Sequence, residues 1–452
     1  MNQHRTIRQL RADAQAIFWA GIEAVDAQKA VARHLSLDDD GILRIGTHIR
    51  IPLSHFRRAF VVGAGKAAAP MAVAVEGVIS SSLLPQGLVN VKYQHTSPRP
   101  RFVLLNECGH PLPDEAGVTG TREIERILDQ LTESDLLFVV VSGGASALLP
   151  APVPGISLEE KQYTTELLLR AGADIYELNA VRKHLSTLKG GQLALRANPA
   201  TVVALVLSDV IGDNLEVIGS GLTVPDSSTF GDALNVLKKH SLLGVLPEAV
   251  MQRLMQGVRC EIAETPKENN SIPNVVHNFV VGSNRLAIES AVQAARALGY
   301  QPLVLSSTLQ GETREVARVH VEILREVIST CNPVKPPACL LSGGETTVTV
   351  HGSGKGGRNQ EFALTAAIAM SGLPNAVILA AGTDGTDGPT DAAGGIVDGT
   401  TGARAIRMGL SPADHLDRND SYPILDALDD LFKTGSTGTN VMDLNIMLAD
   451  GF

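Results

Sequence analysis

A short glycine-rich segment with one cation, residues 63–66 (GAGK), follows the apolar run Phe60-Val61-Val62. Glycines let a backbone approach a ligand closely, and a helix that begins at such a corner presents free N–H groups and its positive dipole end. Gly63 and Gly65 would then contact a bound phosphate, with the Lys66 ammonium beside it. A tight strand-to-helix turn with a solvated lysine explains a lone GxGK about equally well.

The same glycines also fit a dinucleotide site, because Gly63, Gly65 and Ala68 have the spacing of a GxGxxA fingerprint. That fingerprint requires an acidic residue at the end of the next strand, about 20 residues further on. The sequence has KYQH from Lys92 there instead. Binding of NAD(P) is therefore the weaker alternative at this corner.

A second glycine-rich segment, residues 351–361, contains a lysine and Arg358 among four glycines. It is not a Walker A loop, because the glycine spacing differs and Gly356 takes the place of the hydroxyl residue. Consecutive N–H groups in such a loop can form an anion-binding nest, and Arg358 directly precedes an apolar helical pattern. We expect Arg358 to face phosphate, and the alternative is a flexible hairpin tip. The contacts expected beside it are Gly356, Gly357 and Asn359.

Carboxylates gather in the segment GTDGTDGPTD from Gly382, which follows the apolar run 376–381. Hard oxygen ligands at this density suit Mg²⁺ that bridges phosphates, although the spacing is not that of an EF-hand. We therefore expect Asp384 and Asp387 to hold a metal ion. The alternative is a turn-rich loop whose aspartates hydrogen-bond their own backbone.

Three weaker candidates complete the set. Two similar corners, SGGA from Ser142 and SGGE from Ser342, each follow an apolar run. The nucleotide contacts expected at these corners are Ser142, Gly143, Gly144, Ser342, Gly343, Gly344 and Glu345. Asp209 ends another apolar run, where a carboxylate could hold a metal or orient a hydroxyl. The basic cluster formed by residues 179–184 (NAVRKH) and Lys189 could clamp a substrate carboxylate, and a solvated helical face explains it equally well.

The elements that position these residues follow one repeated pattern: a short apolar run, a glycine-rich corner, then a segment with helical periodicity. This repetition is typical of parallel βα units, and ligands gather at the carboxyl ends of the strands in such sheets. With 452 residues the chain is too long for one hydrophobic core. The polar interruption ETPKENNS from Glu264 has neither period. It predicts domains at 1–265 and 275–452, with the last segment free to pack back on the first domain.

Charge and composition exclude several classes of partner. The formal net charge of −10 offers no positive surface for nucleic acid or anionic membranes. The longest uncharged stretch, 136–158, is interrupted by glycines and prolines, which excludes a membrane span. Four cysteines without metal-ligand spacing predict free thiols in a reducing compartment, hence the cytoplasm.

Taken together, these segments resemble one known family through nearly the whole chain. The likeness is carried by GAGKAAAPM from Gly63, GHPLPDEAG from Gly109, SGGASALLPAP from Ser142, LNAVRKHLSTLKGG from Leu178, LSGGETTVTV from Leu341, GKGGRNQEFAL from Gly354 and GTDGTDGPTDAAG from Gly382. The chain resembles the type II glycerate kinases, whose N-terminal part is found with tartrate-utilisation kinases and whose C-terminal region is called MOFRL.

The resemblance implies an α/β protein of two domains with largely parallel sheets, a Rossmann-like N-terminal domain and a smaller MOFRL-type C-terminal domain, with an active-site cleft between them. It implies transfer of the γ-phosphoryl group of ATP, with Mg²⁺, to the 2-hydroxyl of D-glycerate. Lys66 and Arg358, which the residues alone already indicate, stand at the family's active-site positions. Asp209 is our choice for orienting the attacking hydroxyl, and His110 is the second choice.

Some expectations are less specific. We expect a small-molecule substrate, neither nucleic acid nor membrane as partner, and a homodimer as the candidate assembly. An NAD(P)H-dependent hydroxypyruvate reductase is the alternative activity.

Ile211 and Asn214 stand where the family usually has proline and an acid, and Ser436 and Met442 stand where we expect proline and asparagine. These departures leave the phosphate corners intact, and they leave the substrate and any role of Asp443 open.

Overall fold

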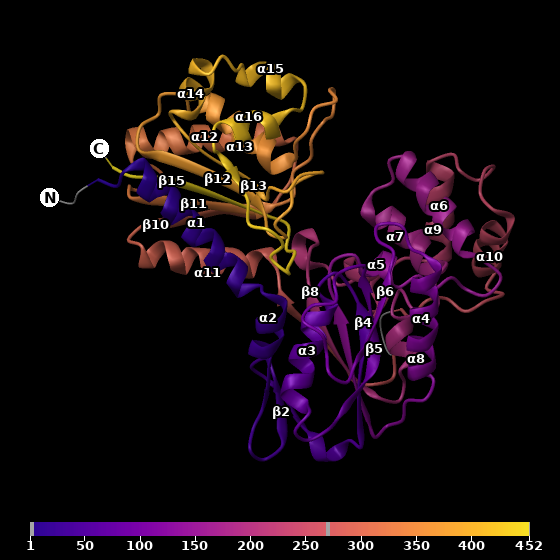
Figure 1. The fold of residues 1–452 in the computed structure, drawn as a ribbon. Helices are drawn as coiled ribbons and strands as arrows, with labels where there is room; N and C mark the ends of the chain where they lie inside the picture. The colour runs from indigo at the N-terminus through magenta and orange to yellow at the C-terminus, as the bar shows by residue number, and fades with distance from the viewer. Residues whose placement is uncertain (1–3, 268–271, 452) are drawn as a thin grey trace. The chain divides into compact units, whose positions relative to one another are not determined.

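The computed structural model describes residues 4–267 and 272–451, and the chain divides into two compact units (Figure 1). The first unit spans Ala27–Val281, and the second unit combines Met1–Asp26 with Gly282–Phe452. Each unit is built around a six-stranded sheet with helices packed on it. The α/β class and the presence of two α/β units are therefore confirmed.

The sheet of the first unit has the strand order β6-β5-β4-β7-β8-β9. All the pairings from β6 to β8 are parallel, as predicted. The strands are β4 (Arg58–Ala64), β5 (Pro85–Lys92), β6 (Leu104–Cys108), β7 (Asp135–Val141), β8 (Thr201–Leu207) and β9 (Val276–Gly282). Strands β4, β7 and β8 are buried along almost their whole length, because helices cover both faces of this part of the sheet.

The helices of the first unit fall into two groups. Around the sheet lie α2 (Ala27–His34), α3 (Ala68–Ile79), α4 (Glu115–Leu128), α5 (Ala145–Leu148) and α8 (Gln192–Arg196). A helical group with an apolar core of its own consists of α6 (Leu158–Arg170), α7 (Ile175–His184), α9 (Phe230–Lys239) and α10 (Glu248–Val258). A small antiparallel sheet of β1 (Leu35–Leu37), β2 (Ile42–Ile45) and β3 (Ile49–Pro52) completes the unit.

The sheet of the second unit is mixed, which corrects the expectation of a largely parallel one. Its order is β10-β11-β15-β12-β13-β14, and among its pairings only β10 with β11 is parallel. The strands are β10 (Gln301–Leu309), β11 (Ala338–Gly344), β12 (Ala376–Gly382), β13 (Gly394–Asp398), β14 (Leu431–Phe432) and β15 (Asp443–Ala449). The last strand causes the difference, because β15 runs antiparallel between β11 and β12. The C-terminal strand β15 is thus in the middle of this sheet.

Helices cover both faces of the second sheet (Figure 1). On one face lie α1 (Ile7–Ala24) and α11 (Asn284–Ala297), and on the other α12 (Thr313–Thr330), α13 (Arg358–Ala369) and α16 (Ser421–Ala427). The short helices α14 (Thr401–Arg407) and α15 (Pro412–Asp417) precede α16. None of the described helices is both long and apolar enough to cross a membrane.

The first helix belongs to the second unit, so the expected boundaries 1–265 and 275–452 are wrong at the N-terminus. Thr6 and Gln9 form a capping box at the start of α1, and the buried face of α1 includes Phe18. That face packs on α11 and the second sheet, and Arg11 bonds the buried Asp430 with Nη1 2.8 Å from Oδ1. The sequence shows an amphipathic opening helix but not its distant partners.

Candidate functional site

The turn after β4 and the turn after β7 form one joined corner in the first unit. The N–H of Lys66 donates to the Gly143 carbonyl at 2.9 Å, and the N–H of Ala67 donates to Ser142 Oγ at 3.0 Å. Gly65 has a φ of +147°, and a Cβ there would lie 2.0 Å from Ser142 Oγ. Only glycine fits this conformation and this approach. The two predicted corners are thus brought together as expected for neighbouring parallel strands.

These hydrogen bonds change what the corner can offer to a ligand. The N–H of Gly65 donates to the Asn90 carbonyl at 3.2 Å, so the amides of residues 65–67 all have acceptors within the protein. These amides are therefore not free to bind a phosphate, and Gly63 and Gly65 allow close approach of the neighbouring strand. The contact of both glycines with a phosphate stays a prediction. The Lys66 side chain can still face an anion.

His110 lies at the same corner as Lys66. A Cβ on Gly144 would come within 2.8 Å of His110 Cδ2 and Nε2, so the ring lies over the start of α5. Burial, followed by the charge of Lys66, lowers the pKa of His110 to about 4. The imidazole is therefore neutral at neutral pH and available as a hydrogen-bond acceptor.

Asp209 lies beyond the end of β8, which is the neighbour of β7 in the sheet. It is partly buried, and Ser208 beside it bonds the backbone of Val210. Since β4, β7 and β8 are adjacent and parallel, Lys66, the Ser142 corner and Asp209 all follow the same edge of the sheet. This is the edge at which ligands bind in open α/β sheets.

Arg358 is the first residue of α13, and it is held by two carboxylates of the second unit. Its Nε and Nη2 atoms lie 2.6 Å and 2.9 Å from the two oxygens of Asp443, and its Nη1 lies 2.7 Å from Glu345 Oε1. Burial works to lower the pKa of Arg358, but the bidentate pair with Asp443 outweighs it and raises that pKa. Burial also raises the pKa of Asp443, against the effect of Arg358.

Asp387 caps the start of the same helix. Its Oδ1 accepts the N–H of Asn359 at 3.1 Å, and its Oδ2 accepts the N–H of Gln360 at 2.9 Å and the Gln360 side-chain amide at 3.0 Å. Burial raises the pKa of Asp387 to about 6, although these hydrogen bonds oppose the shift. A Cβ on Gly357 would lie 2.3 Å from Asp387 Cγ, so glycine is required there for the carboxylate to reach the helix.

The two aspartates do not fit the predicted metal site. Both oxygens of Asp387 already accept hydrogen bonds, and Asp384 Oδ1 accepts the N–H and hydroxyl of Thr386 at 2.9 Å and 3.0 Å. Within residues 4–267 and 272–451, no group of three or more His, Cys, Asp or Glu is placed to hold a metal ion. The alternative interpretation, aspartates that bond the backbone of their own loop, describes Asp384, whereas Asp387 bonds the start of α13.

The residues that were predicted to form a corner after β11 do not form one. Residues 342–344 belong to the strand itself and are buried, because β11 continues to Gly344. Ser342 Oγ lies 3.0 Å from His320 Nε2, and a Cβ on Gly343 would lie 2.0 Å from Asn284 Oδ1. Ser342 and Gly343 are thus closely packed within the second unit, and their contact with a nucleotide stays a prediction. Glu345 is the first residue past the strand, and it reaches Arg358.

The loop before α13 is anchored and is not a flexible hairpin tip. The N–H groups of His351 and Gly352 donate to Asn419 Oδ1 at 2.8 Å and 3.0 Å, and that of Gly354 donates to the Arg418 carbonyl at 3.0 Å. A Cβ on Gly356 would lie 2.2 Å from Ser421 Oγ. The loop therefore fixes the start of α13, and with it Arg358.

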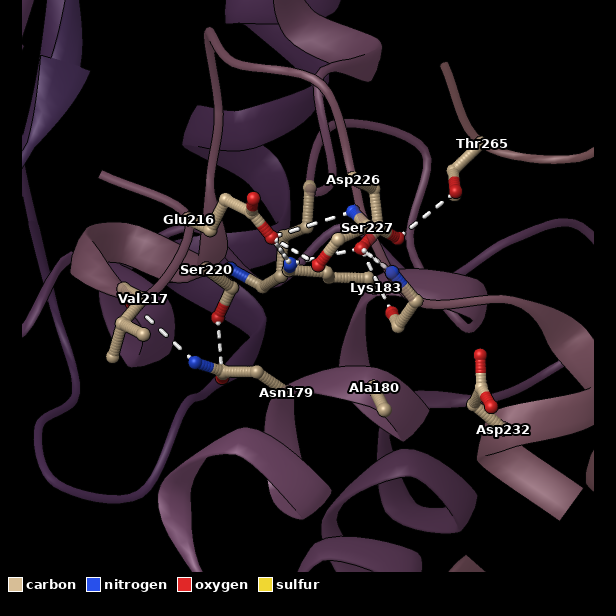
Figure 2. Close-up of polar contacts among 12 residues, drawn as sticks. Asn179, Ala180, Lys183, Glu216, Val217, Ser220, Asp226, Ser227, Asp232 and Thr265 are labelled. Atoms are coloured by element: carbon tan, nitrogen blue, oxygen red, sulfur yellow. Dashed lines mark hydrogen bonds and ion pairs between the residues drawn. The ribbon is translucent and has the colours of Figure 1, made fainter. Parts of the chain in front are cut away.

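The predicted basic cluster on α7 is divided by the structure. Figure 2 shows the Lys183 ammonium directed at Asp226, with its Nζ 2.9 Å from Asp226 Oδ1 and 3.7 Å from Glu216 Oε2. His184 Nε2 lies 2.8 Å from Glu264 Oε1, and Ser220 Oγ donates to Asn179 Oδ1 at 3.0 Å. These residues stabilise the first unit, whereas Arg182 has a different environment, described below.

Asp443 is the site residue that sequence reasoning missed. It is the first residue of β15, only 4% exposed, and it holds both Arg358 and the Asn359 side-chain amide. The sequence does carry a signal for it, since a lone carboxylate opens a strand that is otherwise uncharged. The partner of that carboxylate lies 85 positions away and cannot be read from the pattern.

Comparisons with known proteins give matches to both halves of the chain. Residues 13–255 match the model of a family described as a domain of unknown function, DUF4147, and residues 338–443 match the MOFRL family. Glycerate 2-kinase of Pyrococcus horikoshii is 42% identical over 94% of this chain and 94% of its own length. The crystal structure of glycerate kinase from Thermotoga maritima is similar with a TM-score of 0.86 at 42% identity, covering 98% of this chain and 100% of that one.

One further relative has a different name. A protein of Agrobacterium vitis, 40% identical over 86% of this chain and 87% of its own length, carries a provisional name as a hydroxypyruvate reductase. The matches to both halves and the relatives over nearly the full length establish that this chain belongs to the glycerate kinase family of type II.

Proposed function

We propose that this protein transfers the γ-phosphoryl group of ATP to the 2-hydroxyl of D-glycerate. The observation that carries the proposal is that a glycerate 2-kinase is 42% identical to this chain over 94% of its length. Phosphoryl transfer needs positioning and charge neutralisation rather than covalent chemistry from the protein. The chain supplies cations at both predicted positions.

Each cation has a distinct part in the proposal. Arg358 is kept charged and fixed in orientation by Asp443, so its remaining N–H donors can bind oxygens of the transferred group without reorganisation. Lys66 contributes a compact charge at the corner of β4 and β7. Both would neutralise charge that develops on the phosphoryl group in the transition state.

The attacking hydroxyl needs an oriented acceptor. Asp209 remains our choice, because it follows β8 at the sheet edge that Lys66 also follows. His110 is the second choice, since its neutral imidazole lies at the Lys66 corner. We assign no residue to Mg²⁺, and dependence on the ion is tested directly by titrating it into the assay.

The experiment measures ADP directly by chromatography with glycerate, hydroxypyruvate and tartronate semialdehyde as acceptors, and identifies the product by phosphorus NMR. We expect ADP release that depends on D-glycerate and a 2-phosphoglycerate resonance. Replacing Lys66 or Arg358 by methionine should lower kcat by about a hundredfold or more, the scale for losing a transition-state donor. Lys355→Met is the matched control, because that ammonium lies 4.1 Å from the ring centre of Tyr422. Full turnover in both site variants would refute the assignments.

A reductase is the second candidate, and only the name of the Agrobacterium relative favours it. The amides of residues 65–67, which a dinucleotide pyrophosphate would need, are bonded within the protein. NADH oxidation by hydroxypyruvate, followed at 340 nm in the absence of ATP, is therefore expected to stay at the background rate.

We further propose a cytoplasmic location, since the two exposed cysteines, Cys260 and Cys331, carry free thiols that suit a reducing compartment. The homodimer stays a prediction that sedimentation velocity tests.

A further inference from the structure

Three cations of the first unit influence one another electrostatically: Lys161 on α6, Arg182 on α7 and Lys189 in the turn before α8. Lys161 and Lys189 are 8% and 1% exposed, and Arg182 is partly buried. The charges of Lys161 and Arg182, after burial, lower the pKa of Lys189, which places the three groups within electrostatic reach of one another. We call Lys161, Arg182 and Lys189 the buried cation cluster.

The buried cation cluster has no anionic partner in the described part of the chain. Lys189 Nζ donates to the Leu149 carbonyl at 3.3 Å, whereas the buried Lys161 Nζ has no hydrogen-bond acceptor there. Burial, followed by the charge of Arg182, lowers the pKa of Lys161 to about 7. Proteins nearly always pair a buried charge, because leaving it unpaired is costly.

The same helix shows what pairing looks like when the cation is structural. Lys183, the next residue after Arg182, is bonded to Asp226, and His184 is bonded to Glu264 (Figure 2 draws the first of these pairs). Carboxylates thus pair with Lys183 and His184 on α7, whereas none of the described residues supplies one to Arg182. An arrangement that tolerates this cost is typical of a ligand site.

The buried cation cluster adjoins the corner assigned to the proposed reaction. Leu149, which accepts from Lys189, directly follows α5, the short helix that starts after Ser142-Gly143-Gly144. The N–H of Gly190 donates to the Ser220 carbonyl at 3.0 Å, and Ser220 Oγ lies 2.9 Å from Ser146 Oγ on α5. The cluster and the corner are therefore parts of one packed region of the first unit.

We infer that Lys161, Arg182 and Lys189 form the subsite that binds the carboxylate of the acceptor substrate, an inference that rests on the proposed kinase function. The planar fork of Arg182 matches the two oxygens of a carboxylate, and the lysines add charge behind it. A polyphosphate usually needs a series of free backbone amides, but the N–H groups of Gly190 and Gly191 donate to the carbonyls of Ser220 and Gly221. The region offers side-chain cations, which suits a small carboxylate.

The test compares Lys161→Met and Arg182→Gln with the wild-type full chain, with Arg182→Lys as a milder variant that keeps the charge but loses the fork. The KM for D-glycerate should rise about tenfold or more, as expected for a lost charge-assisted hydrogen bond, while the KM for ATP changes by less than about twofold. D-glycerate alone should protect the wild type against thermal unfolding, and this protection should be lost in Lys161→Met and Arg182→Gln.

The Tm of each variant without ligand separates a binding role of the buried cation cluster from a purely structural one. Lys161→Met replaces an unpaired ammonium by an apolar side chain of similar length, so its Tm without ligand should equal or exceed that of the wild type. Lys183→Met is the matched control on the same helix, and it should lower the Tm by leaving Asp226 unpaired while the KM for glycerate is unchanged. A cluster that only stabilises the fold would lower the Tm in Lys161→Met as well.

Two outcomes would overturn the inference: an increase in the KM for ATP instead of glycerate, or glycerate protection that survives in Lys161→Met and Arg182→Gln. A wild-type protein that glycerate does not protect would also overturn it. Failure of the kinase proposal is distinguishable, because the wild type would then be protected by glycerate without releasing ADP, and the variants would still lose that protection.

Discussion

Ser142 Oγ accepts a hydrogen bond from the N–H of Ala67 at 3.0 Å, which ties the turn after β4 to the turn after β7. Gly65 makes this approach possible, since a Cβ at that position would lie 2.0 Å from the same oxygen. The residues that face this corner are therefore placed by a backbone contact that leaves no room for a side chain.

Gly65→Ala should consequently disrupt the corner. The new methyl group meets Ser142 directly, and the φ of +147° is one that alanine rarely adopts. We expect a loss of about 3 kcal/mol or more in the free energy of unfolding, from overpacking together with backbone strain. Urea denaturation measures it. Gly77→Ala is the control, because Gly77 is an exposed position of α3 with open space around it. That change should stabilise the protein by about 0.5–1 kcal/mol.

Asp443→Asn should lower turnover without abolishing the fold. It removes the charge that holds the Nε and Nη2 edge of Arg358, so the guanidinium is free to move from the orientation seen in the structure. We expect kcat to fall by about 10- to 100-fold, the scale for misplacing a catalytic group, with little change in either KM. Steady-state kinetics measure this. Asp391→Asn is the control, since Asp391 is 65% exposed and pairs only with Lys433 and Tyr422 among the described residues. Equal losses in both variants would contradict the role of Asp443.

His110 should titrate well below an ordinary histidine. Its pKa in the folded protein is about 4, below the usual 6.5. Because the unfolded chain takes up the proton first as the pH falls, the stability that neutral His110 contributes is complete above about 6.5 and is lost toward pH 4. NMR of labelled histidine, assigned with a His110→Gln variant, measures the midpoint.

The charge of Lys66 should be one cause of that low pKa. Lys66→Met is expected to raise the His110 midpoint, and Lys92→Met should raise it less, because Lys66 has the larger effect of the two. An unchanged midpoint in Lys66→Met would show that the ammonium does not lie near the ring, and would remove the support for Lys66 at this corner.

Phe18→Ala should weaken the second unit specifically. Phe18 is fully buried on the face of α1 that packs in the second unit. Truncating a buried phenylalanine costs about 3–5 kcal/mol. Hydrogen exchange should accelerate in α11 and β15 and stay unchanged in β4 and β7, which belong to the first unit. Acceleration that appears instead in β4 and β7 would contradict the unit boundary at Asp26.

The sequence predicts what depends on local pattern. Apolar runs followed by glycine corners predict the parallel strands β4, β7 and β8 and bring Lys66 beside the Ser142 turn. It does not predict that Asp443 opens a strand between β11 and β12, because β15 pairs there with strands that lie far earlier in the chain. Nor does carboxylate density separate a metal ligand from a helix cap, since the groups that bond Asp387 come from residues 359 and 360.

The basic cluster of residues 179–184 shows the same limit of prediction from sequence, here for two adjacent residues. Successive side chains of a helix point about 100° apart, so Arg182 and Lys183 face different neighbours although they are adjacent in sequence. The carboxylate that pairs with Lys183 lies 43 positions away. Composition alone therefore cannot separate a structural cation from a binding one.

The place of α1 has a consequence for synthesis of the protein on the ribosome. Residues 27–281 form a self-contained unit that can fold while the remaining chain is still being translated. The apolar face of α1 is synthesised before its partners α11 and β15, and at usual translation rates the wait until β15 is complete is roughly twenty to eighty-five seconds. During that interval the nascent N-terminus exposes Ile17 and Phe18, so it is the segment on which a ribosome-associated chaperone would act.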